Sequence, residues 1–205
     1  MSEYHPVADV IAQRRSIRHF APGPVDPGLI RELVALACTA PAPHHSHPAR
    51  FVHVMTPDAR ERLADAMSES WLSDLSAEDR SVIEVDRMIK RSRSQVLEAP
   101  ALLVSCLVLD GARSWPDGRR TAAERDMFVQ SLGASLQNIL LAAVERGLAG
   151  YLKGAPLFCA DAIREALVLP DGWHPAFLVL LGYPQDGFEP QPRDAIEPGD
   201  YMVQR

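Results

Sequence analysis

The chain of 205 residues has only two lysines, Lys90 and Lys153, so arginine supplies nearly all of its positive charge. It has only three cysteines, Cys38, Cys106 and Cys159, which lie far apart and form no CxxC pair. Cysteines placed in this way are typical of small core residues in a reducing compartment and give no sign of a disulfide framework. We therefore expect a cytoplasmic protein.

Sequence signals for several functional classes are missing. The net charge of −6 gives no electrostatic support for nucleic-acid binding. The start, MSEYHPVADV, lacks the basic and apolar segments of a secretory signal, and the longest apolar stretch, ALLVSCLVL at 101–109, is too short to span a bilayer. No GxGxxG follows a predicted strand, and no GxxxxGKS/T or HExxH occurs. We therefore expect neither a nucleic-acid partner nor a membrane partner.

Apolar periodicity predicts the order helix, helix, strand, two helices, strand, helix, strand, helix, strand. The strand at 101–109 is apolar at nearly every position, so it must be covered on both faces. These features predict an α+β sandwich in which helices flank a small mixed sheet, as one domain over residues 1–205. The expected helices are 7–15, 27–40, 56–73, 77–98, 122–146 and 160–167, and the expected strands are 50–55, 101–109, 150–153 and 176–181.

The predicted helix at 122–146 is apolar around most of its circumference, with the run MFVQSLGASLQNILLAAV at its middle. Such a helix must be buried, either in a large core or against a second subunit. Gly133, Ala134 and Ser135 would let another backbone come close. Because so apolar a surface is unsuited to a monomer, we expect a homodimer.

The stretch RRSIR at 14–18 places three guanidinium groups and one hydroxyl at the end of a predicted helix. No acidic residue lies between Asp9 and Asp26, so these arginines have no carboxylate partner nearby in the sequence. Guanidinium groups bind phosphate oxygens bidentately. The stretch indicates either a phosphate site or a solvated basic helix end.

Residues 39–54 read TAPAPHHSHPARFVHV and hold three histidines, His44, His45 and His47, within four positions. A zinc site needs three or four ligands of fixed geometry, and the sequence offers no matching ligand motif. Three other interpretations stay open: a catalytic acid or base, an exposed polar loop, and the wall of a pocket for a planar ligand. The loop alone does not choose among them.

Together these stretches resemble the nitroreductase family of FMN-dependent oxidoreductases over essentially the whole chain. The resemblance rests on RRSIR, TAPAPHHSHPARFV, WLSDL, DGARSWPDGRRTAAERDMF, GLAGYLKG and LPDGWHP. In detail the chain is similar to the C-terminal reductase domains of bifunctional coenzyme F-420 biosynthesis proteins. The N-terminal glutamate ligase domain of those proteins has no counterpart in this sequence.

The resemblance implies a role for individual residues. No protein group need be catalytic, because the flavin itself carries the hydride chemistry. A guanidinium group near the N1–C2=O edge would stabilise the anionic reduced flavin. Tyr151 and Lys153 depart from the close relatives. The implied FMN contacts are Arg14, Arg15, Ser16, Ile17, Arg18, Gly154 and, near the phosphate, Arg193, and the implied substrate contacts are Ala42, Asp74, His45 and His47.

The implied reaction is the reduction of a deazaflavin, the dehydro precursor of coenzyme F-420, during biosynthesis of that coenzyme. Two alternatives are a generic NAD(P)H-dependent nitro or quinone reductase, and a non-catalytic flavin or deazaflavin carrier that partners a separate glutamate ligase. An anionic deazaflavin would need a local positive patch on this acidic chain. Candidate sources of that charge are Arg87, Arg91, Arg93 and the pair Arg119 and Arg120.

The histidine loop is expected to bind no metal, because its ligand set is incomplete. Treatment with a chelator should therefore leave flavin content and melting temperature unchanged. A stoichiometric zinc signal in elemental analysis of the purified protein would contradict this expectation.

Overall fold

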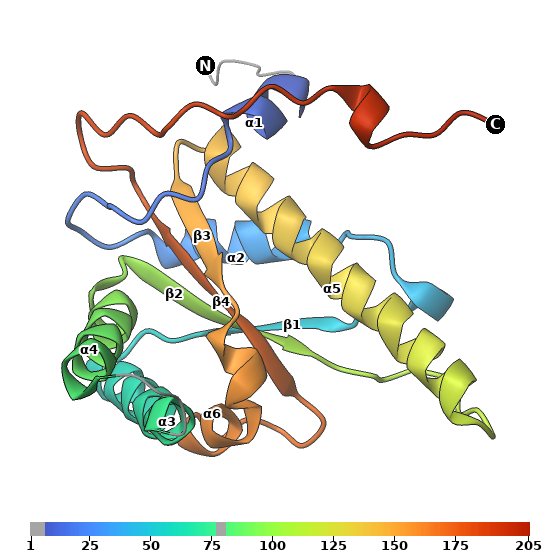
Figure 1. Ribbon diagram of the computed structural model, residues 1–205, viewed down its shortest axis with the longest axis horizontal. Helices are drawn as coiled ribbons and strands as arrows, with labels where there is room; N and C mark the ends of the chain where they lie inside the picture. The colour runs from blue at the N-terminus through green and yellow to red at the C-terminus, as the bar shows by residue number, and fades with distance from the viewer. Residues whose placement is uncertain (1–6, 77–80) are drawn as a thin grey trace.

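Helices and strands follow one another in the predicted order in the computed structural model, which describes residues 7–76 and 81–205. Figure 1 shows a central sheet with helices on both faces. The elements are α1 Val7–Gln13, α2 Pro27–Ala37, β1 Ala49–His53, α3 Pro57–Ser76, α4 Val82–Glu98, β2 Ala101–Leu107, α5 Gly118–Glu145, β3 Ala149–Lys153, α6 Ala160–Ala166 and β4 His174–Gly182, with short 3₁₀ turns η1 Pro43–His45, η2 Ala155–Phe158 and η3 Pro198–Asp200.

The four strands form one sheet in the order β1-β2-β4-β3, and each neighbouring pair is antiparallel. The α+β sandwich is confirmed, but the expectation of a mixed sheet is wrong for these strands. The one parallel pairing in the described part of the chain is an isolated bridge between Ser16 and Gly150. The segment after α1 therefore runs beside β3 without becoming a strand of the sheet.

Strand β2 shows why the sheet needs cover on both faces. Its alternate residues Leu103 and Leu107 belong to a core formed with α2 and α5. The residues between them, including Leu102 and Val104, belong to a second core formed with α3, α4 and α6. Every residue of β2 is buried, as the nearly continuous apolar run predicted. Figure 1 shows α2 and α5 on the upper right of the sheet and α3, α4 and α6 on the lower left.

Helix starts are fixed by side-chain caps, and two of them differ from the predictions. Ser81 and Glu84 form a capping box, so α4 begins at Val82; the predicted start at 77–80 lies outside the described residues. The Asp117 carboxylate accepts from the Arg120 amide, so α5 begins at Gly118, four residues before the predicted position. Both changes follow from local hydrogen bonds that satisfy free amides at a helix start.

Helix α5 is long and apolar enough to cross a membrane by length and composition, but it packs along the sheet instead. Leu136 and Leu140 are 3% and 5% exposed, and both belong to the core of this chain. The apolar residues that remain accessible lie nearer the start of the helix, where Met127 is 40% and Val129 39% exposed. The homodimer stays a prediction, and this exposed part of α5 is its candidate surface.

Two substitutions in α5 should separate core packing from assembly. Leu136→Ala should lower the free energy of unfolding by about 2–5 kcal/mol, because it leaves a cavity in the core. Val129→Glu should leave the fold intact but place a charge on the proposed dimer surface, which should weaken the dimer. Urea unfolding and sedimentation velocity measure the two effects. A Val129→Glu protein that sediments as the unmodified dimer would contradict the assignment of this surface.

Candidate functional site

The segment that follows α1 lies against the free edge of β3. The Ile17 amide donates to the Gly150 carbonyl at 3.3 Å, and Ser16 forms the parallel bridge to the same glycine. A Cβ atom on Gly150 would come within 2.5 Å of the Leu181 side chain, so this position needs glycine. The stretch RRSIR is thus held in an extended conformation along the sheet edge.

Three guanidinium groups gather at the start of this edge. Arg193, from the C-terminal tail, donates to the Arg14 carbonyl and, at 3.5 Å, to the Ile11 carbonyl. Arg15 donates to the Ala12 carbonyl at 2.7 Å. Arg15 and Arg193 therefore satisfy free carbonyl groups at the end of α1. Figure 1 shows the tail passing close to this helix.

Arg14 is the member of this cluster whose side chain has no hydrogen-bond or ion-pair partner within the described part of the chain. Burial, followed by the charges of Arg193 and Arg15, lowers the pKa of Arg14. None of the three arginines forms an ion pair with a described carboxylate. Positive charge concentrated without compensation is the arrangement that a phosphate group would neutralise.

Further cations continue along the edge of β3. The Arg18 guanidinium lies 5.1 Å from the centroid of the Tyr151 ring, which is a cation–π contact. Tyr151 is buried, and burial raises its pKa while Arg18 and Arg91 act in the opposite direction. The next side chain on the same face of β3 is Lys153. Positive groups therefore line this edge from the end of α1 to the end of β3.

Lys153 is tied to α4. Its ammonium donates to the Ser92 hydroxyl at 2.6 Å and to the Gln95 side-chain oxygen at 3.1 Å. Burial and then the charge of Arg91 lower the pKa of Lys153 to about 8. Gly154 follows directly and is the N-cap of η2, and a Cβ atom there would lie 3.3 Å from the Phe177 ring.

A cavity of about 530 Å³ opens beside Ser92, between α3, α4 and η2. Asp74, which the sequence predicted as a substrate contact, lines it. Cys159 also lines it, and burial, followed by the charge of Asp74, raises the pKa of its thiol to about 11. The cavity is lined by Met67, Ser70, Trp71, Asp74, Ser92, Ala155, Phe158 and Cys159.

The histidine loop is held by a buried carboxylate that the sequence reasoning missed. Glu124 is 4% exposed and accepts from His44 Nε2 at 2.8 Å, the Arg113 amide at 2.9 Å and Trp115 Nε1 at 3.1 Å. The Arg113 amide is the largest cause of the lowered pKa of Glu124. Glu124 stands in the charged run TAAERD, where no sequence signal separates a buried glutamate from a solvated one.

The structure shows how two histidines of the loop are held and whether the loop has the ligands for a metal. His44 is engaged by Glu124, and both His44 and His45 have positive φ angles, 55° and 54°. Over residues 7–76 and 81–205, no three histidine, cysteine, aspartate or glutamate side chains come together as a set that could hold a metal ion. That the loop binds no metal stays a prediction, which elemental analysis and chelator treatment of the purified protein would test.

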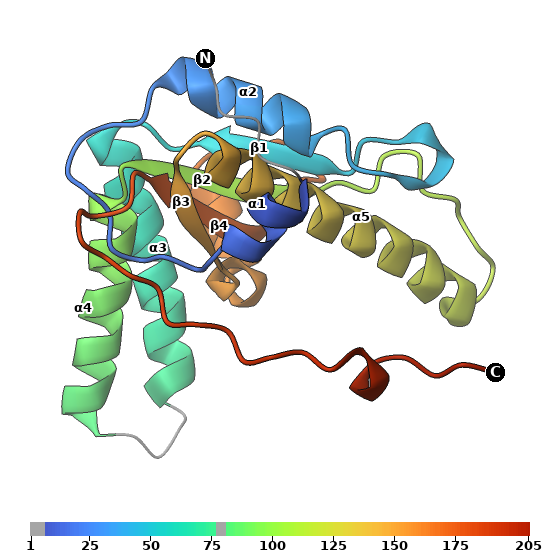
Figure 2. The ribbon, with the colours of Figure 1, turned by 90° about the horizontal axis from the view of Figure 1, so that it is seen from above.

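One chain does not bring the histidine loop to the arginine cluster. The Ser131 hydroxyl of α5 donates to the Pro41 carbonyl at 2.7 Å, which fixes the loop against the first half of that helix. Figures 1 and 2 show η1 well separated from α1. Within a single chain Ala42, His45 and His47 therefore do not lie beside the arginine cluster, and their role as a pocket wall stays a prediction.

The arginines proposed to bind an anionic substrate differ in whether their charge is already paired and in how near they lie to the 530 Å³ cavity. Arg93 forms ion pairs with Asp65 and, at 2.9 Å, with Glu61, so its charge is already compensated. Arg120 pairs with Asp117 and stacks on a neighbouring tryptophan ring, far from the cavity in sequence and structure. Arg91 is exposed and close enough to influence Lys153. It is the candidate that lies near the 530 Å³ cavity.

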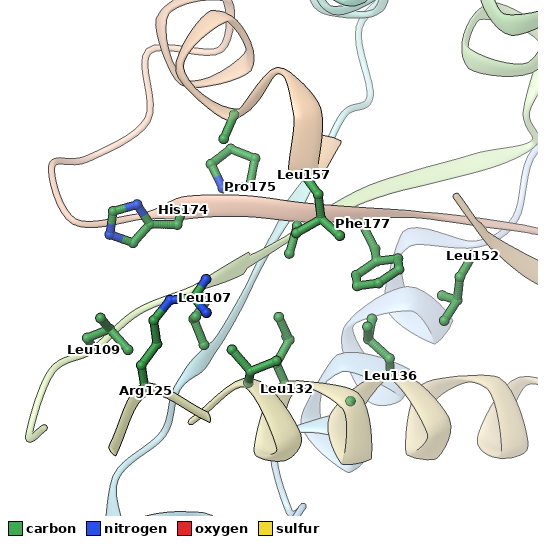
Figure 3. Close-up of a pocket in the computed structure, with 14 residues that line it drawn as sticks. Leu107, Leu109, Arg125, Leu132, Leu136, Leu152, Leu157, His174, Pro175 and Phe177 are labelled. Atoms are coloured by element: carbon green, nitrogen blue, oxygen red, sulfur yellow. The ribbon is translucent and has the colours of Figure 1, made fainter. Parts of the chain in front are cut away.

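A second cavity, of about 720 Å³, lies on the opposite face of the sheet between α5, the start of β4 and η2. Figure 3 shows mostly apolar side chains around it, with Arg125 and His174 at one end. Gly133 and Val129 of α5 line it, and the space in front of Gly133 is open. This cavity continues the accessible part of α5.

Known proteins resemble this chain in sequence and in fold. A Burkholderia lata protein designated an NADH dehydrogenase/NAD(P)H nitroreductase is 34% identical over 170 residues, which cover 78% of this chain and 76% of that protein. Iodotyrosine deiodinase of Danio rerio is 25% identical over 175 residues, and the chain spans only 57% of its length. The crystal structure of a nitroreductase-like family protein from Bacillus cereus has a TM-score of 0.76 and 25% identity, over 100% of this chain and 98% of that one. The profile of the nitroreductase family matches residues 11–183, and the chain therefore belongs to the nitroreductase family.

Proposed function

We propose that this chain is an FMN-dependent oxidoreductase that passes a hydride from NAD(P)H to a conjugated acceptor bound beside α3 and α4. The observation that carries the proposal is the cluster of Arg14, Arg15 and Arg193, which has no carboxylate partner among the described residues. Membership of the nitroreductase family supports the enzyme class. The designation of the Burkholderia lata relative supports NAD(P)H as the electron donor.

The residues at the edge of β3 offer a partner for each part of FMN: the phosphate, the ribityl chain and the ring. Arg14, Arg15 and Arg193 would hold the phosphate, whose two negative charges the cluster can neutralise. Ser16 offers a hydroxyl for the ribityl chain. Arg18 would face the polar edge of the ring, where its charge favours the reduced form. Bound FMN supplies the hydride chemistry, and the chain binds and orients it.

The acceptor would occupy the 530 Å³ cavity, at the end of the row of cations. Trp71 and Met67 give it an apolar wall for a planar ligand, and Asp74 lies at the same cavity. The Ser92 hydroxyl, which is held by Lys153, adds a polar group that would orient an oxygen of the acceptor. A site with few polar groups and an apolar wall excludes water and favours conjugated acceptors.

We further propose that two copies of the chain complete the site. The histidine loop and the arginine cluster lie at different places along α5, so a single copy leaves each of them unfinished. The accessible surface at Val129 and Gly133 allows a second chain to approach. In such a homodimer, His45 and His47 of one copy would reach the flavin pocket of the other.

A narrower proposal concerns the acceptor itself. A deazaflavin precursor of coenzyme F-420 is favoured by one observation: the exposed Arg91 stands beside Lys153, next to the cavity, and could meet an anionic tail. Arg93 is excluded from this role by its ion pairs with α3. A generic nitro or quinone reductase is the alternative, and a deazaflavin carrier that serves a separate glutamate ligase is a third. We place this activity in a single-domain cytoplasmic protein.

Arg14→Ala should yield a folded protein that retains less FMN. The substitution removes a charge-assisted contact of about 1.5–3 kcal/mol, so the dissociation constant should rise about tenfold to a hundredfold. Flavin absorbance per protein and a fluorescence titration with FMN measure the effect. Arg119→Ala, an exposed arginine far along the chain, is the matched control. Equal FMN affinity in both variants would refute the phosphate assignment.

The acceptor class can be tested by titrating the FMN-loaded protein with coenzyme F-420 and its dehydro precursor. If the acceptor is an anionic deazaflavin, its affinity should fall steeply with salt, while FMN binding should change little because it is more buried. Arg91→Ala should weaken the deazaflavin, whereas Arg87→Ala, one turn earlier on the same helix, should not. Turnover of menadione and nitroaromatics without any deazaflavin binding would select the generic reductase.

A further inference from the structure

Among the residues that the structure describes, none accepts a hydrogen bond from the Ser92 hydroxyl. Its side chain is 7% exposed and lines the 530 Å³ cavity. The oxygen accepts a hydrogen bond from the Lys153 ammonium at 2.6 Å, and no bond donated by this hydroxyl occurs among residues 7–76 and 81–205. A buried donor without a partner costs free energy, so an acceptor supplied by a ligand would be favourable.

The Lys153 ammonium donates to this hydroxyl, and it has only neutral hydrogen-bond partners among the described residues. Both of its hydrogen-bond partners, Ser92 and Gln95, are neutral groups on α4. The ionisable groups that act on it are Arg91 on α4 and Cys159 beside η2, and no described carboxylate is within ion-pair distance. An ammonium group so placed releases its proton more readily than a solvated lysine.

We propose that Ser92 is the proton donor to an acceptor oxygen in the cavity, and that Lys153 acts through Ser92 by positioning its hydroxyl and replacing its proton. The proposal deepens the function proposed above and rests on it. It fits acceptors that carry a conjugated carbonyl, quinone or nitro oxygen, since each gains a proton on that oxygen during reduction. It applies to a quinone and to a deazaflavin carbonyl alike.

The proton balance of the reaction requires such a donor. Reduction of a quinone to a hydroquinone takes two electrons and two protons, and a transferred hydride brings both electrons but only one proton. The second proton would pass from Ser92 Oγ to the quinone oxygen as the Lys153 proton moves to Ser92 Oγ. Lys153 is then a neutral amine and regains a proton from solvent. At the end of the reaction the quinone has been reduced to the hydroquinone, and the reduced cofactor has been oxidised.

A purely structural role for Lys153, as a link between β3 and α4, makes different predictions. Loss of a link lowers stability at every pH, whereas loss of a proton source changes the pH dependence of one step. The pKa of about 8 fixes the direction of that dependence. Below this pH Lys153 carries its proton and can replace that of Ser92; above it the proton is lost, and acceptor reduction slows.

The decisive measurement is the oxidation of the reduced, FMN-loaded protein by menadione, followed by stopped flow from neutral pH to about pH 10. In the unmodified protein the rate should fall about tenfold per pH unit above the lysine pKa. Lys153→Arg keeps the charge but cannot titrate in this range, so its profile should be flat. Ser92→Ala should be slower by about a hundredfold at neutral pH. Lys90→Met, the only other lysine, should retain the profile of the unmodified protein.

A second readout does not depend on turnover. Because the chain has only two lysines, NMR titration of isotope-labelled lysine should resolve Lys90 and Lys153 separately. Lys153 should titrate with a pKa of about 8. A descending limb that persists in Lys153→Arg, or a Lys153 that stays protonated throughout this pH range, overturns this proposal while FMN binding is untouched. An unmodified protein that binds no FMN overturns the proposed function itself.

Discussion

The antiparallel pairing of β2 with β4 is the constraint on which the other features depend. Both strands lie inside the sheet and are buried on both faces, so each face must be covered by helices. Helices α2 and α5 cover one face, and α3, α4 and α6 cover the other. This arrangement leaves the outer edge of β3 for the segment after α1, and the side chains suited to cofactor binding therefore gather along that edge.

The charge distribution at this edge is costly for the chain alone. Guanidinium groups repel one another, and the lowered pKa of Arg14 reflects both burial and the neighbouring arginines. The chain could have relieved this repulsion with a carboxylate, as it does at Arg93, where two acidic side chains of α3 compensate the charge. Cations that stay uncompensated next to a sheet edge are better explained by a bound anion than by the stability of the fold.

Sequence patterns predicted most of the architecture because apolar periodicity and caps act locally. The order of elements, the buried strand at 101–109 and the cap of α2 at Asp26 all depend on neighbours in the sequence. Strand directions do not depend on neighbours in the sequence, so the sequence did not reveal that the sheet is antiparallel. The sequence also left open what covers the apolar helix at 122–146, since an apolar helix face does not reveal whether a sheet or a subunit covers it; Leu136 and Leu140 belong to the core of the chain. The bond from Lys153 to Ser92 joins residues 61 positions apart, which no local pattern encodes.

The histidine loop brings these arguments together. Two consecutive non-glycine residues with positive φ cost on the order of 1–3 kcal/mol each, so the loop would relax unless other contacts held it. Glu124 supplies such contacts, because one buried carboxylate accepts from His44, the Arg113 amide and Trp115 at once. A fully bonded buried carboxylate fixes geometry more firmly than an exposed pair does. His45 and His47 are thereby displayed on a rigid loop that lies away from the arginine cluster of the same chain. Strain maintained at such a position is better explained by contacts with a second copy than by the folding of one chain.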